Sequence, residues 1–500
     1  MSKPRKGCSN ARVDACPSRF GSIVGRMSLR PILGLAALLC SASAAHAQHI
    51  TPQMLRDHVA ILAGDAYEGR EPGTPGGDRA EAYVLQAFAD AGLKPGAPDG
   101  RWRQEVALTA IEGKSATASV TRGGRTTPLT NIVAIGDQPH TRVDNAGIVY
   151  AGGLEADAIA AAPVRGKVVV MPLSAGRAAK GRALAKAGAV AAIYLTPVTI
   201  SEADVRENFG RSTVRDGEAL PIPVAYLSEA QAAALLGDRA AALAKVGITK
   251  DFRPVDIDGT FDLTATTTRR RYTTANIVGM IPGRTRPNEA VLLSAHWDHI
   301  GICRAEGAPD RICNGAADNA SGTAILIEVA KVLAKGPAPE RSIYFVATTA
   351  EEKGLIGADA YAAAVAQTPL KIVANLNIDT AAIVPTGMPV AMVGRGNHPK
   401  IDAIVDATAR AIGRKVDTDT EANIMVQRQD GWAFGKRGIP AVMATGSVSD
   451  MKRLFAYLDG PYHKPNDDLA HIDLSGAAED ADLHVALARA LADLARYPAN

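Results

Sequence analysis

The sequence has few aromatic residues, few cysteines and almost no excess of charge, and each shortage excludes a class of protein. Aromatic side chains make up 4% of its 500 residues, and five cysteines are too few for a small scaffold held together by disulfides. The formal net charge of +3 is almost neutral for a chain of this length, and part of it lies in the N-terminal segment. The charge therefore does not indicate a nucleic-acid-binding protein. The short basic runs, Arg269–Arg271 and the cluster of Lys3, Arg5 and Lys6, are typical of solvated faces and leaders.

What is present is an average globular composition on a long chain. Hydrophobic residues make up 47% of the sequence and charged residues 21%, which favours a folded protein over a disordered one. A chain of 500 residues exceeds the size that one hydrophobic core usually organises. The length therefore favours two or more domains.

Residues 1–47 have the pattern of a signal peptide. Arg30 supplies a positive flank, Pro31–Cys40 is apolar, and Ala45–Ala47 is the small-x-small pattern that a signal peptidase recognises. The apolar part is shorter than the roughly 20 residues of a membrane-spanning helix, which disfavours the alternative of an uncleaved anchor. Cleavage before Gln48 predicts an exported chain, periplasmic or secreted, with no stable membrane insertion after the leader is removed.

Only Cys303 and Cys313 remain among the cysteines once this leader is removed. An exported chain folds in an oxidising compartment, so we expect a disulfide between them that closes the loop Ile302–Asn314. Two free thiols are the alternative. Metal binding by these cysteines is disfavoured, because no second cysteine pair completes a thiolate site.

Residues 48–121 are interpreted as the N-terminal part of the main domain. Apolar residues recur at helical spacing in Leu55–Leu62 and in Ala80–Phe88, which predicts two helices. Between them, Gly69–Gly77 is rich in glycine and proline and predicts a structured, turn-rich loop.

Residues 122–260 have a different texture and predict a small α/β insert. Strand-like runs alternate with an alanine-rich helix at Arg177–Ala187. The predicted strands are Ala146–Tyr150, Lys167–Met171, Ala191–Leu195 and Pro221–Tyr226.

Residues 261–500 alternate apolar strands with helices such as Gly322–Ala334. This alternation predicts an α/β fold in which a mixed, mostly parallel sheet is sandwiched by helices. The predicted strands are Ala290–Ser294, Arg341–Thr348, Ile372–Ile378 and Pro440–Ala444. Because ligands of such sheets bind beyond the carboxyl ends of the strands, the polar residues that follow these strands are the candidate site.

His296 and Asp298 follow the first of these strands. Side chains alternate along an extended chain, so both should point the same way. The carboxylate could then take the second imidazole proton while the other ring nitrogen meets a metal. His299 should point away. Alone, a His-x-Asp pattern is more typical of a structural or surface histidine.

Carboxylates occupy the equivalent places elsewhere in this region. Asp318 lies just before the predicted helix, where an ordinary N-cap is the alternative. Glu351 and Glu352 are adjacent after an apolar strand, where neighbouring like charges raise one pKa unless a cation is present. A metal removes this conflict if one carboxylate binds it and the other stays free as a general base.

Asp379 ends another apolar strand, and His463 lies beside Tyr462 in a polar loop. Two histidines and three carboxylates suit Zn, Mn or Co, and the histidines favour zinc. The predicted metal ligands are His296, Asp318, Glu352, Asp379 and His463. Three carboxylates and one hydroxide balance two divalent cations, which predicts two Zn²⁺ per chain.

In this order, the motifs resemble the co-catalytic di-zinc aminopeptidase family, which includes bacterial leucyl aminopeptidases and, more distantly, glutamate carboxypeptidase II. The matching motifs are His296-x-Asp298, Asp318–Gly322, Glu351-Glu352-x-Gly-Leu, Asn377-x-Asp379 and Tyr462-His463. The resemblance implies a zinc exopeptidase fold, peptide substrates and an exported metallopeptidase, specifically an aminopeptidase.

The same resemblance implies a role for each residue. His296 and Asp379 would hold one zinc, Glu352 and His463 the other, and Asp318 would bridge the two. The catalytic residues would be Glu351 as the general base, Asp298 as the group that orients His296, and Tyr462 as a hydrogen-bond donor to the oxyanion.

The insert resembles a protease-associated domain, on the motifs Arg165–Val170 and Gly188–Ile193. Gly69–Gly77 resembles a glycine-rich entry loop, with a plain connection as the alternative. One motif departs from the family, because Gln429–Gly431 stands where many relatives have Ser-Asp-His, so the pocket wall should differ there. Two other functions stay open: a single-zinc transferase like the glutaminyl cyclases, and a non-catalytic binding homologue.

Overall fold

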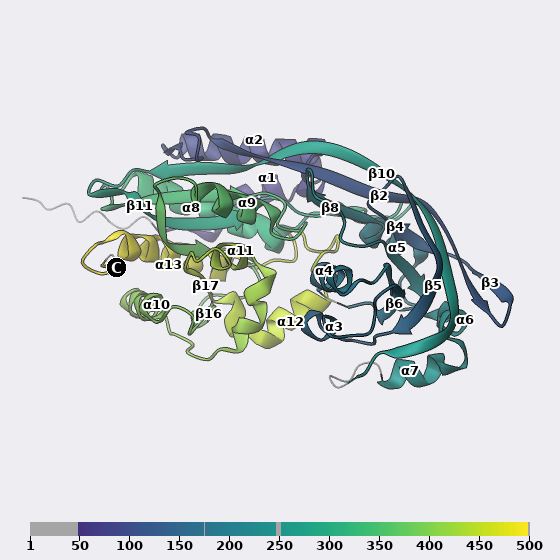
Figure 1. Ribbon diagram of the computed structural model, residues 1–500. Helices are drawn as coiled ribbons and strands as arrows, with labels where there is room; N and C mark the ends of the chain where they lie inside the picture. Colours follow the sequence, from purple (N-terminus) through teal and green to yellow (C-terminus); the bar gives the residue numbers. More distant parts are fainter. Residues whose placement is uncertain (1–48, 175, 247–251, 499–500) are drawn as a thin grey trace, which may run out of the picture. The chain divides into compact units, whose positions relative to one another are not determined.

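The computed structural model describes residues 49–174, 176–246 and 252–498 (Figure 1). The predicted leader, residues 1–47, lies outside the described residues. From Gln48 onward the chain forms one compact unit. A search of the described helices finds none with the length and apolar character needed to cross a membrane.

The central sheet contains the four strands predicted for residues 261–500, which are β11, β14, β15 and β17, and two further strands, β10 and β16. Their order is β16-β17-β15-β11-β14-β10. Their bounds are β10 (Val255–Ile281), β11 (Arg286–His296), β14 (Arg341–Thr348), β15 (Lys371–Asn377), β16 (Ala391–Val393) and β17 (Ala441–Thr445). β11 pairs in parallel with β14 and β15, and β15 pairs in parallel with β17. β10 and β16 pair antiparallel at the two sides of this group. The predicted mixed, mostly parallel sheet is confirmed.

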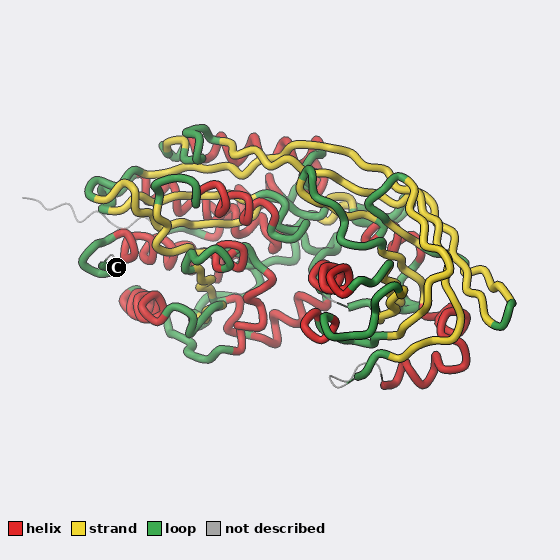
Figure 2. Tube along the Cα trace, viewed as in Figure 1, coloured by secondary structure: helices red, strands yellow, loops and turns green. Residues whose placement is uncertain are grey.

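Helices cover both faces of this sheet (Figure 1 and Figure 2). One face packs against α1 (Pro52–Leu62), α2 (Pro75–Asp90), α8 (Gly322–Ala334) and α13 (Leu474–Ala492). The other packs against α9 (Ile356–Val365) and α11 (Gly431–Gly435). Alternation along β11 explains why both faces are apolar, since Val291 and Leu293 enter the first core and Leu292 enters the second.

Threonine caps set the starts of the first two helices. Thr51 accepts a hydrogen bond from Met54 N, and Thr74 accepts one from Gly77 N. Each cap precedes a proline in the first turn, where a missing N–H costs nothing. The predicted loop Gly69–Gly77 is therefore wrong at its end, because Thr74 and Pro75 begin α2 within it.

The insert shares the sheet with the main domain. Its strands β5 (His140–Tyr150), β6 (Lys167–Pro172), β7 (Ala191–Thr196) and β9 (Val224–Ser228) are parallel neighbours, with α4 at Arg177–Ala187. β2 (Arg103–Arg122) pairs antiparallel along most of β10, and β10 also pairs with β5 (Figure 1). The proposed boundaries at 121/122 and 260/261 fall within these two long strands. Two hydrophobic clusters of the insert are nevertheless separate from the core around β11.

Shorter elements complete the described chain. The remaining strands are β1 (Lys94–Pro95), β3 (Arg125–Leu129), β4 (Val133–Ile135), β8 (Arg211–Arg215), β12 (Gly301–Ile302) and β13 (Ile312–Cys313). The remaining α-helices are α3 (Ala156–Ile159), α5 (Glu202–Phe209), α6 (Ala232–Leu236), α7 (Ala240–Val246), α10 (Pro399–Ala411) and α12 (Met451–Asp459).

Candidate metal centre

The polar residues singled out in the sequence meet at one edge of the central sheet. β11 ends at His296, and Glu351 and Glu352 follow the end of β14, while Asp379 follows the end of β15. Because these three strands are parallel neighbours, their carboxyl ends lie side by side. Asp318 reaches the same edge from a tight turn, Ala316–Ser321, at the start of α8.

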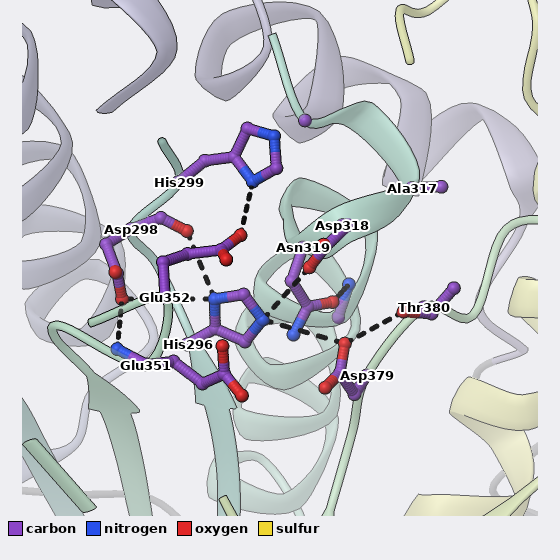
Figure 3. Close-up of polar contacts among 12 residues, drawn as sticks. His296, Asp298, His299, Ala317, Asp318, Asn319, Glu351, Glu352, Asp379 and Thr380 are labelled. Carbon is purple, nitrogen blue, oxygen red and sulfur yellow. Dashed lines mark hydrogen bonds and ion pairs between the residues drawn. The ribbon is translucent and has the colours of Figure 1, made fainter. Parts of the chain in front are cut away.

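The first group of donor atoms surrounds His296 (Figure 3). Its Nε2 lies 3.2 Å from Asp318 Oδ1 and 3.6 Å from Asp379 Oδ1. All three residues are buried, with at most 7% of their surface exposed. They could therefore act as three ligands of one ion.

The second group surrounds His463, which comes from the loop after α12. Its Nε2 lies 3.0 Å from Glu352 Oε2 and 3.3 Å from Asp318 Oδ2. Asp318 thus presents one carboxylate oxygen to each histidine. This is the arrangement that a carboxylate bridging two metal ions requires.

The donor chemistry of both groups fits divalent cations. The Nε2 atoms of His296 and His463 are buried and have no hydrogen-bond partner of good geometry in the described structure. Buried carboxylates need pairing or a metal, and here Asp318 and Glu352 are 6% and 4% exposed at their side chains. Imidazole and carboxylate ligands together suit zinc, manganese or cobalt.

The charges around the centre favour the ionised form of Asp318 and Glu352, which is the form that binds a metal. Burial opposes the charged form of Asp318, yet the imidazoles of His296 and His463 beside it hold its pKa well below the usual range. Burial likewise opposes ionisation of Glu352, but the charge of His463 brings its pKa below normal. The imidazoles respond in the opposite sense, because neighbouring carboxylates raise the pKa of His463 to about 10 against the effect of burial. A metal that binds here must displace those imidazole protons.

Glu351 differs from its neighbour Glu352 in both place and charge. It belongs to neither donor group. Burial raises its pKa well above the usual range, and the carboxylates of Glu352 and Asp430 add to this effect. Two adjacent carboxyl groups whose pKa values are pushed apart are typical of a site that assigns them different chemical roles.

The part of the chain that contains this site matches a known protein family. Residues 276–488 match the profile of Peptidase family M28, and the match contains both donor groups and Glu351. This part of the chain belongs to Peptidase family M28. The predicted resemblance to co-catalytic zinc aminopeptidases is thereby confirmed.

Proteins similar to this chain include two aminopeptidases. Aminopeptidase YwaD of Bacillus subtilis is 26% identical over 220 residues, which cover 42% of this chain and 43% of YwaD. Leucine aminopeptidase 1 of Ajellomyces capsulatus is 26% identical over 226 residues, which cover 43% of this chain and 56% of that protein. The alignments thus span about half the length of these relatives.

Solved structures share the fold over most of the chain. An aminopeptidase from Aneurinibacillus sp. strain AM-1 superposes with a TM-score of 0.57 at 19% identity, covering 89% of this chain and 94% of that one. A zinc aminopeptidase from Bacillus subtilis gives a TM-score of 0.52 at 18% identity, covering 88% of this chain and 94% of that one. The coverage extends the shared fold well beyond the M28 match.

The group that orients His296 in this M28 site is a main-chain carbonyl. His296 Nδ1 lies 3.1 Å from the carbonyl oxygen of Asp298, whereas the Asp298 carboxylate is 3.9 Å away. The carboxylate instead accepts a hydrogen bond from Glu351 N at 3.1 Å. Burial raises the pKa of Asp298 to about 7. The expectation that the carboxylate itself takes the imidazole proton is therefore wrong, although Asp298 still contacts both His296 and the Glu351 segment.

His299 lies on the site, so the expectation that it points away is wrong. Its Nδ1 lies 2.7 Å from Glu352 Oε1, and its ring is fully buried (Figure 3). The reason is that β11 ends at His296. Strict alternation of side chains does not continue into the loop that follows.

Replacing His299 with Phe should weaken metal binding about 10- to 100-fold, since the Glu352 carboxylate would lose the imidazole that orients it. Chelator competition on the purified protein measures the affinity. His471→Phe is the matched control, because His471 is 60% exposed at its side chain and pairs with Asp468, away from both donor groups. Equal affinities of the His299 variant and the wild type would contradict this role.

Asp467 is a residue of the site that the sequence patterns did not identify. Its carboxylate accepts hydrogen bonds from Ala317 N at 2.9 Å and Asp318 N at 3.2 Å, and another from the Tyr457 hydroxyl at 2.9 Å. Asn319 makes a similar link, donating from Nδ2 to the carbonyl of Ile378 at 2.9 Å. The bonds to Ala317, Asp318 and Asn319 hold the Asp318 turn in place, and each of them joins segments that are distant in the sequence.

Tyr462 and Asp430 both lie close to the charged residues of the centre. The Tyr462 ring stacks on His463 with 3.7 Å between ring centres, and burial raises the pKa of its hydroxyl well above normal. Asp430, in the motif that departs from the family, bonds to the hydroxyl of Thr348 at the end of β14. Burial raises the pKa of Asp430 to about 6.

Cys303 and Cys313 form the predicted disulfide. It joins the strands β12 and β13, which lie between the His296 segment and the Asp318 turn. In the same hairpin, Arg304 forms an ion pair with Asp204 of α5, at 3.4 Å. The insert therefore contacts the segment that separates two ligands.

Proposed function

We propose that this chain is an exported zinc aminopeptidase that removes N-terminal residues from peptides. The observation that carries the proposal is Asp318, whose two carboxylate oxygens face two different histidines. That geometry supports two ions, and we assign His296 and Asp379 to one and Glu352 and His463 to the other. The names of the relatives, which are aminopeptidases, support the choice of reaction.

Each residue of the chain then has a defined task. Bound zinc would act as a Lewis acid on the peptide carbonyl and lower the pKa of a bound water. Glu351 accepts the proton of the attacking water and returns it to the leaving amine, since its place outside both donor groups leaves its carboxyl free for this task. Tyr462, beside His463, donates a hydrogen bond to the oxyanion. Asp298 holds the main chain between His296 and Glu351.

The location and the insert belong to the same proposal. The leader pattern supports export, and the disulfide between Cys303 and Cys313 is consistent with an oxidising compartment. Residues 122–260 would be a protease-associated insert, because their separate hydrophobic clusters surround a small parallel sheet. The ion pair between Arg304 and Asp204 supports a role of the insert near the substrate pocket.

The full chain should hydrolyse aminoacyl p-nitroanilides that have a free N-terminus and spare the same substrates after N-acetylation. We expect 1,10-phenanthroline to abolish this activity, zinc to restore it, and metal analysis to find two zinc ions per chain. A panel that includes peptides with a free or amidated C-terminus separates aminopeptidase from carboxypeptidase activity. Absence of chelator-sensitive hydrolysis across the panel refutes a peptidase, and one tightly bound zinc with cyclisation of N-terminal glutamine identifies the cyclase-like alternative.

A further inference from the structure

Arg70 is a fully buried arginine in the connection between α1 and α2. Among the described residues, its guanidinium donates hydrogen bonds to four main-chain carbonyls and to no side chain. The acceptors are Trp297 O at 2.8 Å, Leu62 O at 2.8 Å, Asn314 O at 2.6 Å and Gly315 O at 2.9 Å. Four of its five N–H groups are thus satisfied by backbone alone.

Three of these carbonyls belong to the segments that carry proposed metal ligands. Trp297 follows His296 directly, and its carbonyl lies between His296 and Asp298 in the chain. Asn314 and Gly315 lead into the turn that presents Asp318. One rigid, planar side chain therefore sets the spacing between the His296 segment and the Asp318 turn.

The two neighbours of Arg70 make further contacts with the same region. Gly69 has a φ of +66°, and a Cβ there would lie 2.4 Å from Cys313 O and 2.7 Å from Gly301 O, so the segment packs directly on the disulfide hairpin. Glu71 forms an ion pair with Lys353 at 3.0 Å. Because Lys353 follows Glu352 directly, the segment Gly69–Glu71 contacts the His296 segment, the hairpin that leads to Asp318 and the loop that carries Glu352.

The charge of Arg70 is also placed unusually. A buried arginine normally pairs with a carboxylate, yet the described part of the chain shows no ion pair of Arg70, only carbonyl acceptors. The nearest anionic influences are Asp467, Asp318, Asp298 and Glu352, which oppose the effect of burial on its pKa. The positive charge of Arg70 therefore interacts with several carboxylates of the site, and in the described structure it forms an ion pair with none of them.

We propose that the segment Gly69–Glu71, and Arg70 above all, positions the His296 and Asp318 loops and thereby sets the zinc affinity of the centre. The proposal rests on the proposed function, since it concerns the same metal site. Arg70 acts through the backbone of other residues and is a positioning residue. The composition of Gly69–Glu71 suggests only a connection between two helices, but in this proposal the segment also positions metal-ligand loops.

The test compares Arg70→Lys and Arg70→Met with the wild type in the full chain. Zinc affinity is measured by chelator competition, and Co²⁺-substituted protein gives a visible absorption spectrum that reports ligand geometry. We expect about 10- to 100-fold weaker zinc binding and an altered cobalt spectrum. Thermal unfolding of the metal-free proteins shows separately how much the fold itself is weakened. Arg79→Met is the control, because Arg79 is 44% exposed and pairs with Glu68 beside the segment.

Folded Arg70 variants with the zinc affinity and cobalt spectrum of the wild type would overturn the proposal. If neither variant folds, Glu71→Gln decides, because Glu71 and Lys353 are partly exposed and their loss leaves the core intact. Unchanged zinc affinity in Glu71→Gln then overturns the proposal, and weaker zinc binding supports it. A wild type that binds no zinc would refute the proposed function itself, so the two failures are distinguishable.

Discussion

Replacing Glu351 with Gln should leave the metal content unchanged and reduce kcat roughly a thousandfold, the range expected for loss of a general base. Glu351 lies outside both donor groups, so its removal costs no ligand. Burial, together with the surrounding carboxylates, raises the pKa of Glu351 and so favours the protonated form, which is the form that returns a proton to the leaving amine. Steady-state kinetics and metal analysis on the same preparation measure both effects.

The adjacent residue supplies the matched control. Glu352→Gln is the same chemical change one position along the chain, but it should lose zinc, since Glu352 Oε2 lies 3.0 Å from His463 Nε2 and Oε1 lies 2.7 Å from His299 Nδ1. Opposite effects of the two variants on metal content would separate the base from the ligand. An active Glu351→Gln enzyme would remove Glu351 from the mechanism.

Replacing Asp318 with Asn should lower the zinc content from two ions to one or none and reduce activity by roughly a thousandfold or more, because metal ions supply several kcal/mol of transition-state stabilisation. An amide offers one oxygen where the carboxylate offers two, so it cannot face both His296 and His463. It also removes one of the negative charges that balance the ions. Metal analysis after extensive dialysis measures the loss.

Asp468→Asn is the control for this variant, since Asp468 is 35% exposed at its side chain and lies in the loop that carries Asp467. It should keep both metals and full activity. Two zinc ions held by Asp318→Asn with the affinity of the wild type would show that the two ions do not share this carboxylate.

The order of motifs along the chain was enough to predict the main elements of the fold and the residues of the candidate site. β14 and α8 have the bounds that were predicted from apolar runs, because a buried parallel strand and a buried helix are each continuous in composition. Their positions at strand ends then predicted that His296, Glu352 and Asp379 lie close together, since the carboxyl ends of neighbouring parallel strands lie at the same edge of a sheet. Apolar runs in the sequence and the rule that ligands bind at strand ends are thus enough to predict these elements and the site.

Contacts between distant segments could not be predicted in this way. β11 ends at His296, and the packing of the loop that follows sets the direction of the chain. His296 Nδ1 therefore contacts the Asp298 carbonyl, and His299 lies against Glu352. The insert shares its sheet with the main domain because β2 and β10 continue through both.

The sequence by itself determined which residues could bind metal and which could act as a base, since those are properties of residue type and of position at a strand end. Only the tertiary structure decided how the ligands are held. Asp467 and Arg70 bind main-chain groups of loops far away in the chain, and a main-chain carbonyl or N–H looks the same at every position of a sequence. Their roles became visible only once folding had brought those loops together.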